Sequence, residues 1–186
     1  LDYVTLATAS PEVAARQYRK AGNMTDRAAA LSVLTMRHPG SAEAAEALAD
    51  FEARFGNDPL VMDKWFQIQA IAPGDGAVDR VRALMTHPGF SLGNPNRVRS
   101  LIGTYTTANQ TGFHRIDGAG YELLAEIALS VDPKNPQLSA RLATAFRSWR
   151  SLEETRRERA RATLSRIKAA PALSADLRDI VERTLA

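Results

Sequence analysis

Arg97 and Arg99 are the residues of this chain whose type and placement most suggest chemistry. They follow Asn94-Pro95, a strong helix-start signal, because asparagine caps free backbone N–H groups and proline brings a pre-set φ and no N–H. Both cations then fall in the first helical turn, where the helix dipole disfavours an exposed cation by about 0.3–1 kcal/mol. A guanidinium stays charged and offers a fork of donors to a carboxylate. The placement suggests a use other than helix stability, but the pattern alone favours the other interpretation, that both side chains are solvated or paired with acids elsewhere.

The residue types that catalysis or metal binding would need are missing or scattered. The chain has no cysteine, and its three histidines, His38, His87 and His114, fall in predicted loops or helix ends. The HExxH zinc motif, the GxSxG nucleophile elbow and the glycine-rich phosphate loops do not occur. The sequence therefore predicts no catalytic residues and no metal site within this chain.

A second group of cations lies between Arg147 and Lys168, where eight lysines and arginines accompany three acids. The spacing of the acids predicts local ion pairs, Glu153 with Arg157 and Glu158 with Arg161. Apolar residues at helical spacing predict one buried side: Leu152, Ala160, Leu164 and Ile167. An exposed amphipathic helix is the favoured interpretation, and nucleic-acid binding is the weaker alternative.

Helix-start signals recur along the chain, and no alternating strand pattern accompanies them. Four pairs join a capping residue to a proline: Ser10-Pro11, Asp58-Pro59, Asn94-Pro95 and Asn135-Pro136. Further caps are expected at Thr25, Ser41, Ser151 and Ser174. With apolar residues at three- and four-residue spacing between these caps, the sequence predicts helices over residues 2–8, 11–21, 26–37, 42–55, 59–71, 77–86, 95–108, 118–131, 136–148, 152–169 and 175–185.

Short loops and one internal echo predict how these helices are arranged. Short connections between consecutive helices favour antiparallel neighbours. The segment 36–40 (MRHPG) is echoed 49 residues later by 85–89 (MTHPG), a period close to that of HEAT and armadillo repeats. The alternative is a helix-stop signal that both segments share. We therefore expect an all-α fold of stacked antiparallel helix pairs, a HEAT/armadillo-like superhelical domain.

Length and composition bound the class of protein. The 186 residues, of which 45% are hydrophobic and 24% charged, fit one soluble domain, and no run is long and apolar enough to cross a bilayer. The net charge of +3 permits an acidic partner without identifying one. The absence of cysteine fits a reducing compartment, so we expect a cytoplasmic protein. The opening residues, 1–7, read as the tail of a helix already under way, so we expect residues 1–186 to be a single domain of a longer chain.

Five segments of the chain, in the same order and spacing, resemble the C-terminal domain of bacterial aminopeptidase N, a gluzincin zinc metallopeptidase. They are residues 23–26 (NMTD), 60–66 (LVMDKWF), 94–103 (NPNRVRSLIG), 117–121 (DGAGY) and 135–137 (NPQ). The resemblance implies a helical stack that caps the active-site cavity of a separate catalytic domain, which carries the zinc and the HExxH motif. The parent enzyme would remove N-terminal amino acids from peptides, and this chain alone would be inactive. Its partners would then be that catalytic domain and the peptide substrates, with no nucleic acid and no membrane.

The resemblance also implies roles for particular residues. Two arginines are expected to face the cavity and meet the carboxylate side of a peptide: Arg99, and Arg141, six residues after Asn135. Asn96 and Arg97 are expected to hold the loop geometry. The alternative function, from a different class, is a free-standing helical-repeat scaffold that binds a protein partner.

Overall fold

The computed structural model describes residues 2–186, and every regular element in this part of the chain is helical. The first half contains α1 (Asp2–Thr8), α2 (Glu12–Lys20), α3 (Met24–Arg37), α4 (Ala42–Phe55), α5 (Pro59–Ile71) and α6 (Ala77–Met85). The second half contains α7 (Pro95–Val98), a π-helical turn (Arg99–Gly103), α8 (Thr104–Ala108), α9 (Gln110–Phe113), α10 (Ala119–Val131), α11 (Pro136–Ala143), two 3₁₀ turns (Thr144–Phe146 and Trp149–Ser151), α12 (Glu154–Lys168) and α13 (Ala175–Leu185). The all-α prediction is confirmed.

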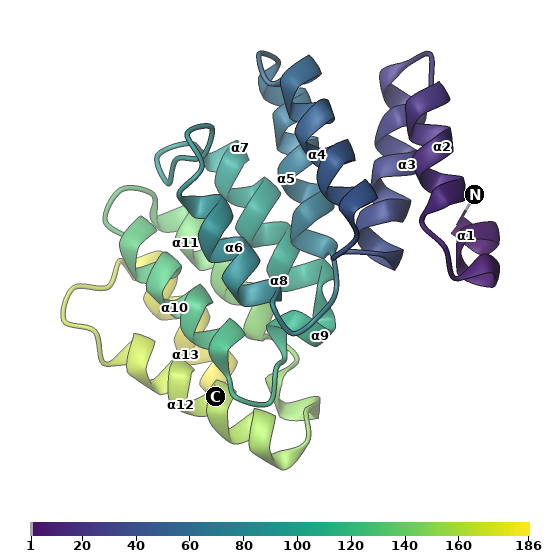
Figure 1. Cartoon of the computed structure of the whole chain (residues 1–186). Coiled ribbons are helices and arrows are strands. Elements are labelled where there is room, and N and C mark those ends of the chain that lie inside the picture. Colours follow the sequence, from purple (N-terminus) through teal and green to yellow (C-terminus); the bar gives the residue numbers. More distant parts are fainter. Residues whose placement is uncertain (1) are drawn as a thin grey trace.

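The helices form two layers that run from α1 at one end to α12 and α13 at the other (Figure 1). One layer holds α2, α4, α6, α10 and α12, and the other holds α3, α5, α7–α8, α11 and α13. Consecutive helices pack as pairs across the layers, with extensive contact between α2 and α3 and between α10 and α11. The stack of helix pairs is therefore as predicted.

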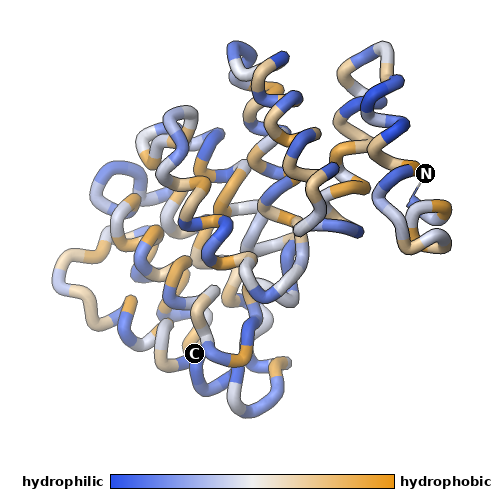
Figure 2. Tube along the Cα trace, viewed as in Figure 1, coloured by the Kyte–Doolittle hydropathy of each residue, from blue (hydrophilic) through white to orange (hydrophobic). Residues whose placement is uncertain are grey.

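One hydrophobic core runs between the two layers. Its largest fully buried side chains include Phe51, Phe66, Tyr105, Phe113 and Tyr121. Hydrophobic and hydrophilic residues alternate along most helices (Figure 2), as expected where each helix has one side in the core. None of the helices in residues 2–186 combines the length and apolar character of a membrane-spanning segment.

Most helices match their predicted ranges to within one or two residues at each end, and two differ by more than that. The helix predicted over 95–108 begins at Pro95 but widens into a π-helical turn at Arg99–Gly103, where the N–H of Thr104 donates to the carbonyl oxygen of Arg99, five residues earlier. The helix predicted over 136–148 ends at Ala143 and tightens into 3₁₀ turns. The short helix α9 was not predicted.

Five of the eight predicted caps are confirmed and three are not. The first of the three exceptions is Ser10, because the cap position of α2 is Pro11, which makes no side-chain cap hydrogen bond. Asp58, Asn94, Asn135, Ser41 and Ser174 each accept a backbone N–H of the following turn. The cap of α3 is Asn23 rather than Thr25, with its Oδ1 2.8 Å from the nitrogen of Asp26. The cap of α12 is Glu153 rather than Ser151, because its carboxylate accepts two N–H groups, those of Thr155 at 2.8 Å and Arg156 at 2.9 Å. A carboxylate cap also carries the negative charge that a helix start favours.

Candidate functional site

Arg99 and Arg141 lie on the wall of one hollow, although 41 residues separate them in the sequence. The hollow has a volume of about 320 Å³ and opens between the π-helical turn, α8 and α11. Arg99 belongs to the π-helical turn and Arg141 to the last turn of α11, and both side chains are exposed. The fold therefore brings together the two cations that the resemblance singled out.

The hydroxyl groups around this hollow are engaged with the backbone. Thr107 Oγ1 donates to the carbonyl oxygen of Gly103 at 2.7 Å, and Thr144 Oγ1 donates to that of Arg141 at 2.6 Å. Thr106 Oγ1 donates to Gly103 as well, at 3.1 Å. The wall is thus polar, but its free charge comes from the two guanidinium groups.

Asn96 determines how the Arg99 side chain lies. The amide oxygen of Asn96 accepts a hydrogen bond from Nη2 of Arg99. The backbone N–H of Asn96 donates in turn to Oδ1 of Asn94, the cap of α7, at 3.0 Å. The capped helix start therefore holds Asn96, and Asn96 holds the Arg99 side chain. The guanidinium of Arg141 has no hydrogen bond or ion pair to any other residue among those the structure describes. Both cations therefore keep donors available for an anion.

Arg97 points away from the hollow into the core, with only 7% of its surface exposed. Its Nη1 lies 2.9 Å from Oδ1 of Asp63 on α5, and its guanidinium carbon lies 5.0 Å from the ring centre of Phe66. The Nη1–Oδ1 contact is an ion pair whose angles do not form a hydrogen bond, and Arg97 Nε also lacks a partner. Arg97 thus ties the first turn of α7 to α5 by charge and ring contact.

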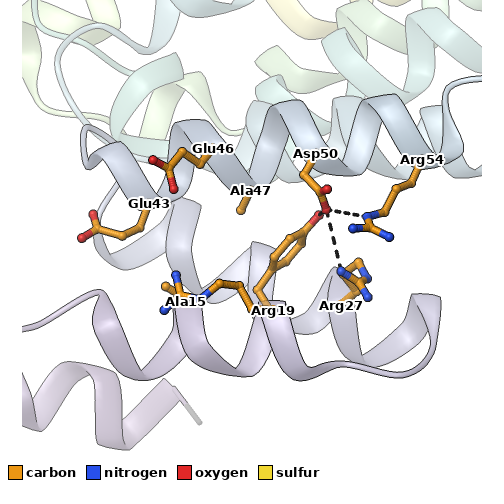
Figure 3. A pocket seen from close by; sticks show the side chains of 9 residues that line it. Ala15, Arg19, Arg27, Glu43, Glu46, Ala47, Asp50 and Arg54 are labelled. Carbon is orange, nitrogen blue, oxygen red and sulfur yellow. Dashed lines mark hydrogen bonds and ion pairs between the residues drawn. The ribbon is translucent and has the colours of Figure 1, made fainter.

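A second hollow lies between α2, α3 and α4, and within it Asp50 is paired with its neighbours (Figure 3). Asp50 accepts hydrogen bonds from Tyr18 at 2.9 Å and Arg54 at 2.7 Å, and Arg27 approaches it to 3.7 Å. The hydrogen bond from Arg54 holds the pKa of the Asp50 carboxyl below its usual range, and burial raises the pKa of Tyr18. The hollow has a volume of about 240 Å³, and three arginines and three acids line it. Sequence reasoning missed this cluster because its members come from three helices without a shared motif.

Within the cation-rich segment 147–168, the exposed helix α12 begins only at Glu154, and the predicted apolar stripe is confirmed except at Leu152, which precedes the helix and is only partly buried. Ala160, Leu164 and Ile167 are fully buried. The predicted pair of Glu153 with Arg157 is wrong: Glu153 pairs with Arg156 at 3.0 Å, because capping the helix turns its carboxylate toward the first turn. The predicted pair of Glu158 with Arg161 is not formed either.

The histidines and acids of the described chain do not assemble a metal site. Within residues 2–186 no three such side chains lie together as possible ligands. His87 Nε2 bonds Glu52 at 2.7 Å, and His114 Nδ1 bonds the Tyr121 hydroxyl at 2.9 Å. The donor set that zinc requires is therefore not present in these residues.

Comparison with known proteins places the chain in a family. The model of the family described as "Domain of unknown function (DUF3458_C) ARM repeats" matches residues 1–186. Aminopeptidase N of Haemophilus influenzae is 36% identical over 185 residues, which are 100% of this chain and 21% of that protein. Aminopeptidase N of Escherichia coli is 36% identical over 171 residues, 92% of this chain and 19% of that protein. Aminopeptidase N of Caulobacter vibrioides is 38% identical over 165 residues, 89% of this chain and 19% of that protein.

A solved structure has the same fold. The crystal structure of Legionella pneumophila aminopeptidase A in complex with aspartic acid superposes with a TM-score of 0.87 at 36% identity, over 94% of this chain and 20% of that one. The chain spans about a fifth of the length of the relatives it matches. It belongs to the DUF3458_C family of ARM-repeat domains, as its resemblance to the C-terminal domain of bacterial aminopeptidase N predicted.

Proposed function

We propose that this chain is the C-terminal helical domain of a zinc aminopeptidase N, and that it caps the active-site cavity and helps admit or position peptide substrates. The observation that carries the proposal is the shared hollow of Arg99 and Arg141. The similarity of the chain to aminopeptidase N along its length supports the same assignment.

The chemistry of the hollow fits the carboxylate end of a peptide. Arg99 and Arg141 supply charged donors from two separate elements, so a carboxylate between them can bond to both. A hydrogen bond to a charged group contributes about 1.5–3 kcal/mol. Binding the far end of a peptide in this way orients the chain for attack at its N-terminus, which is positioning rather than chemistry.

The bond-breaking step itself belongs to the part of the parent protein outside this chain. Zinc in that catalytic domain would activate the attacking water, and no residue of this chain takes part in that step. We propose that the whole enzyme is cytoplasmic. Measurement of the zinc content and mass of the native protein, together with cell fractionation, tests these points.

The test of the site uses the full-length protein and paired substrates. Short peptides with a free C-terminal carboxylate are compared with the same peptides ending in an amide. Arg99→Ala or Arg141→Ala should lower kcat/KM for the carboxylate series about tenfold, the effect of about 1.4 kcal/mol, and leave the amide series nearly unchanged. Arg16→Ala on α2 is the matched control, because Arg16 is exposed on a helix at the other end of the stack (Figure 1). Equal losses on both series would contradict carboxylate binding.

A further inference from the structure

The hollow of Arg99 and Arg141 is one of three that follow each other along the same layer of helices. A hollow of about 330 Å³ lies between α3 and α5, and one of about 450 Å³ lies between α5 and α7. Lys64 lines both of these, and Arg99 lines both the second and the hollow beside α11. Because neighbouring hollows share a lining residue, they lie next to one another, and we call the three together the α3–α11 groove.

The groove carries positive charge that nothing within it neutralises. Lys64, Arg99 and Arg141 line it, and the only carboxylate that lines it is Asp63, which pairs with Arg97 at 2.9 Å. Lys64 is exposed and has no hydrogen bond or ion pair within the described part of the chain. The hollow between α2 and α4 differs, since its arginines and acids are equal in number. The groove is therefore complementary to an anionic ligand.

The shape of the α3–α11 groove and its uncharged lining residues indicate that the ligand is a peptide. Three shallow hollows in series fit an extended chain better than a compact small molecule. The lining contains amide and hydroxyl side chains, such as Gln67, Asn96 and Ser100, that can bond a peptide backbone. It contains no aromatic residue, whereas single-stranded nucleic acids are bound by stacking bases on aromatic rings.

We propose that the α3–α11 groove binds peptide substrates in extended form, and that Lys64 is a specificity-determining residue that contacts an acidic side chain within the peptide. Arg99 and Arg141 then hold the C-terminal carboxylate, so this inference rests on the proposed function. Lys64 lines the two hollows next to that of Arg141, so a peptide whose C-terminal carboxylate is held by the arginines contacts Lys64 only if it is long enough to run back along the groove. The parent enzyme should accordingly favour longer peptides with an interior aspartate or glutamate over neutral peptides of the same length.

The experiment varies two features of an octapeptide series and measures kcat/KM with the full-length protein. Each peptide has either Asp or Asn at one interior position, which is moved along the peptide, and ends in either a carboxylate or an amide. Wild-type protein should prefer Asp over Asn about three- to fivefold at one or more interior positions, the size expected for one exposed ion pair. Lys64→Ala should abolish this preference, Lys64→Arg should retain it, and added salt should weaken it.

Lys20→Ala is the matched control, since Lys20 is an exposed lysine at the end of α2 in the other layer. An Asp/Asn ratio near one at every position, or a ratio that Lys64→Ala leaves unchanged, overturns the role of Lys64. The carboxylate/amide ratio reports on Arg99 and Arg141 separately, so failure of the proposed function is distinguished from failure of this inference. Inhibition by a single-stranded oligonucleotide that Lys64→Ala relieves, without any Asp preference, would assign the groove to nucleic acid instead.

Discussion

Arg97 and Asp63 form a buried ion pair that joins α7 to α5, with 2.9 Å between Nη1 and Oδ1. The side chain of Arg97 is 8% exposed and that of Asp63 is 16% exposed, so water screens the pair only weakly. Arg97 is two residues before Arg99, and Asp63 is one residue before Lys64. The pair therefore joins α5, which carries Lys64, to α7, which leads directly into the π-helical turn that carries Arg99.

Removing one member of this pair should destabilise the fold. Asp63→Asn leaves the Arg97 charge buried without its partner, and we expect it to lower the free energy of unfolding by about 3 kcal/mol. Urea unfolding followed by circular dichroism measures the change.

The double variant Asp63→Leu/Arg97→Met is the control that separates the loss of a partner charge from the replacement of buried side chains. It should recover much of the loss, because replacing both charges with apolar groups leaves no charge unpaired. If the double variant loses more unfolding free energy than Asp63→Leu and Arg97→Met lose together as single variants, the two charges do not stabilise each other.

Gly120 lies too close to Phe113 to tolerate a side chain. A Cβ at Gly120 would lie 2.3 Å from the carbonyl oxygen of Phe113 and 2.8 Å from its Cα, so the backbone of α9 would have to move. Phe113 in turn packs against Tyr121 and Phe146, with ring centres 5.3 and 5.9 Å apart. Gly120→Ala should therefore destabilise the chain by about 1–3 kcal/mol, the usual result of overpacking.

Gly22→Ala is the matched change at an open site. A Cβ at Gly22 would have no atom within 4 Å, so the same substitution should alter the unfolding free energy by less than about 0.5 kcal/mol. If Gly120→Ala unfolds at the same urea concentration as Gly22→Ala, the close approach of α9 to α10 is not rigid.

Stability should fall in mild acid because of His114. Burial lowers the pKa of His114 below its ordinary value of 6.5, and the charge of Arg156 lowers it further. The folded chain thus binds this proton more weakly than the unfolded chain, so unfolding takes up a proton as the pH falls below 6.5. The stability that the folded chain gains from keeping His114 neutral is therefore present above pH 6.5 and is lost as the pH falls below it.

The measurement compares the wild type with His114→Gln, which keeps a polar group near the Tyr121 hydroxyl. The unfolding free energy of the wild type should fall more steeply between pH 7 and pH 5 than that of the variant, since other titrating groups are common to both. Parallel curves for the two proteins would mean that His114 is not the group responsible.

Local signals in the sequence were sufficient for most of the fold. Asp58-Pro59, Asn94-Pro95 and Asn135-Pro136 each begin a helix, because the cap and the proline act within one turn. The apolar spacing of these helices then determines which side is buried, and this gives the two-layer stack.

Features that depend on contacts between distant segments could not be predicted in this way. The amide of Asn109 is buried, and its Nδ2 donates to the carbonyl oxygens of Ala70 at 3.0 Å and Ala72 at 2.8 Å, which end α5. Nothing near Asn109 in the sequence indicates those partners. The partner of Arg97 is likewise 34 residues away, and only the chain's resemblance to a known domain linked Arg99 with Arg141.

Asn96 should act on substrate through Arg99. Its Oδ1 accepts a hydrogen bond from Arg99 Nη2, so it reduces the number of orientations that the guanidinium can adopt. In the full-length protein, Asn96→Ala should raise KM for peptides with a C-terminal carboxylate about threefold, with kcat and the amide series little changed. Because Asn96 is exposed, the same variant should keep the wild-type melting temperature. The double variant Asn96→Ala/Arg99→Ala should lose no more than Arg99→Ala alone, since Asn96 has no effect without the side chain it orients. Additive losses would instead give Asn96 a direct contact with the peptide.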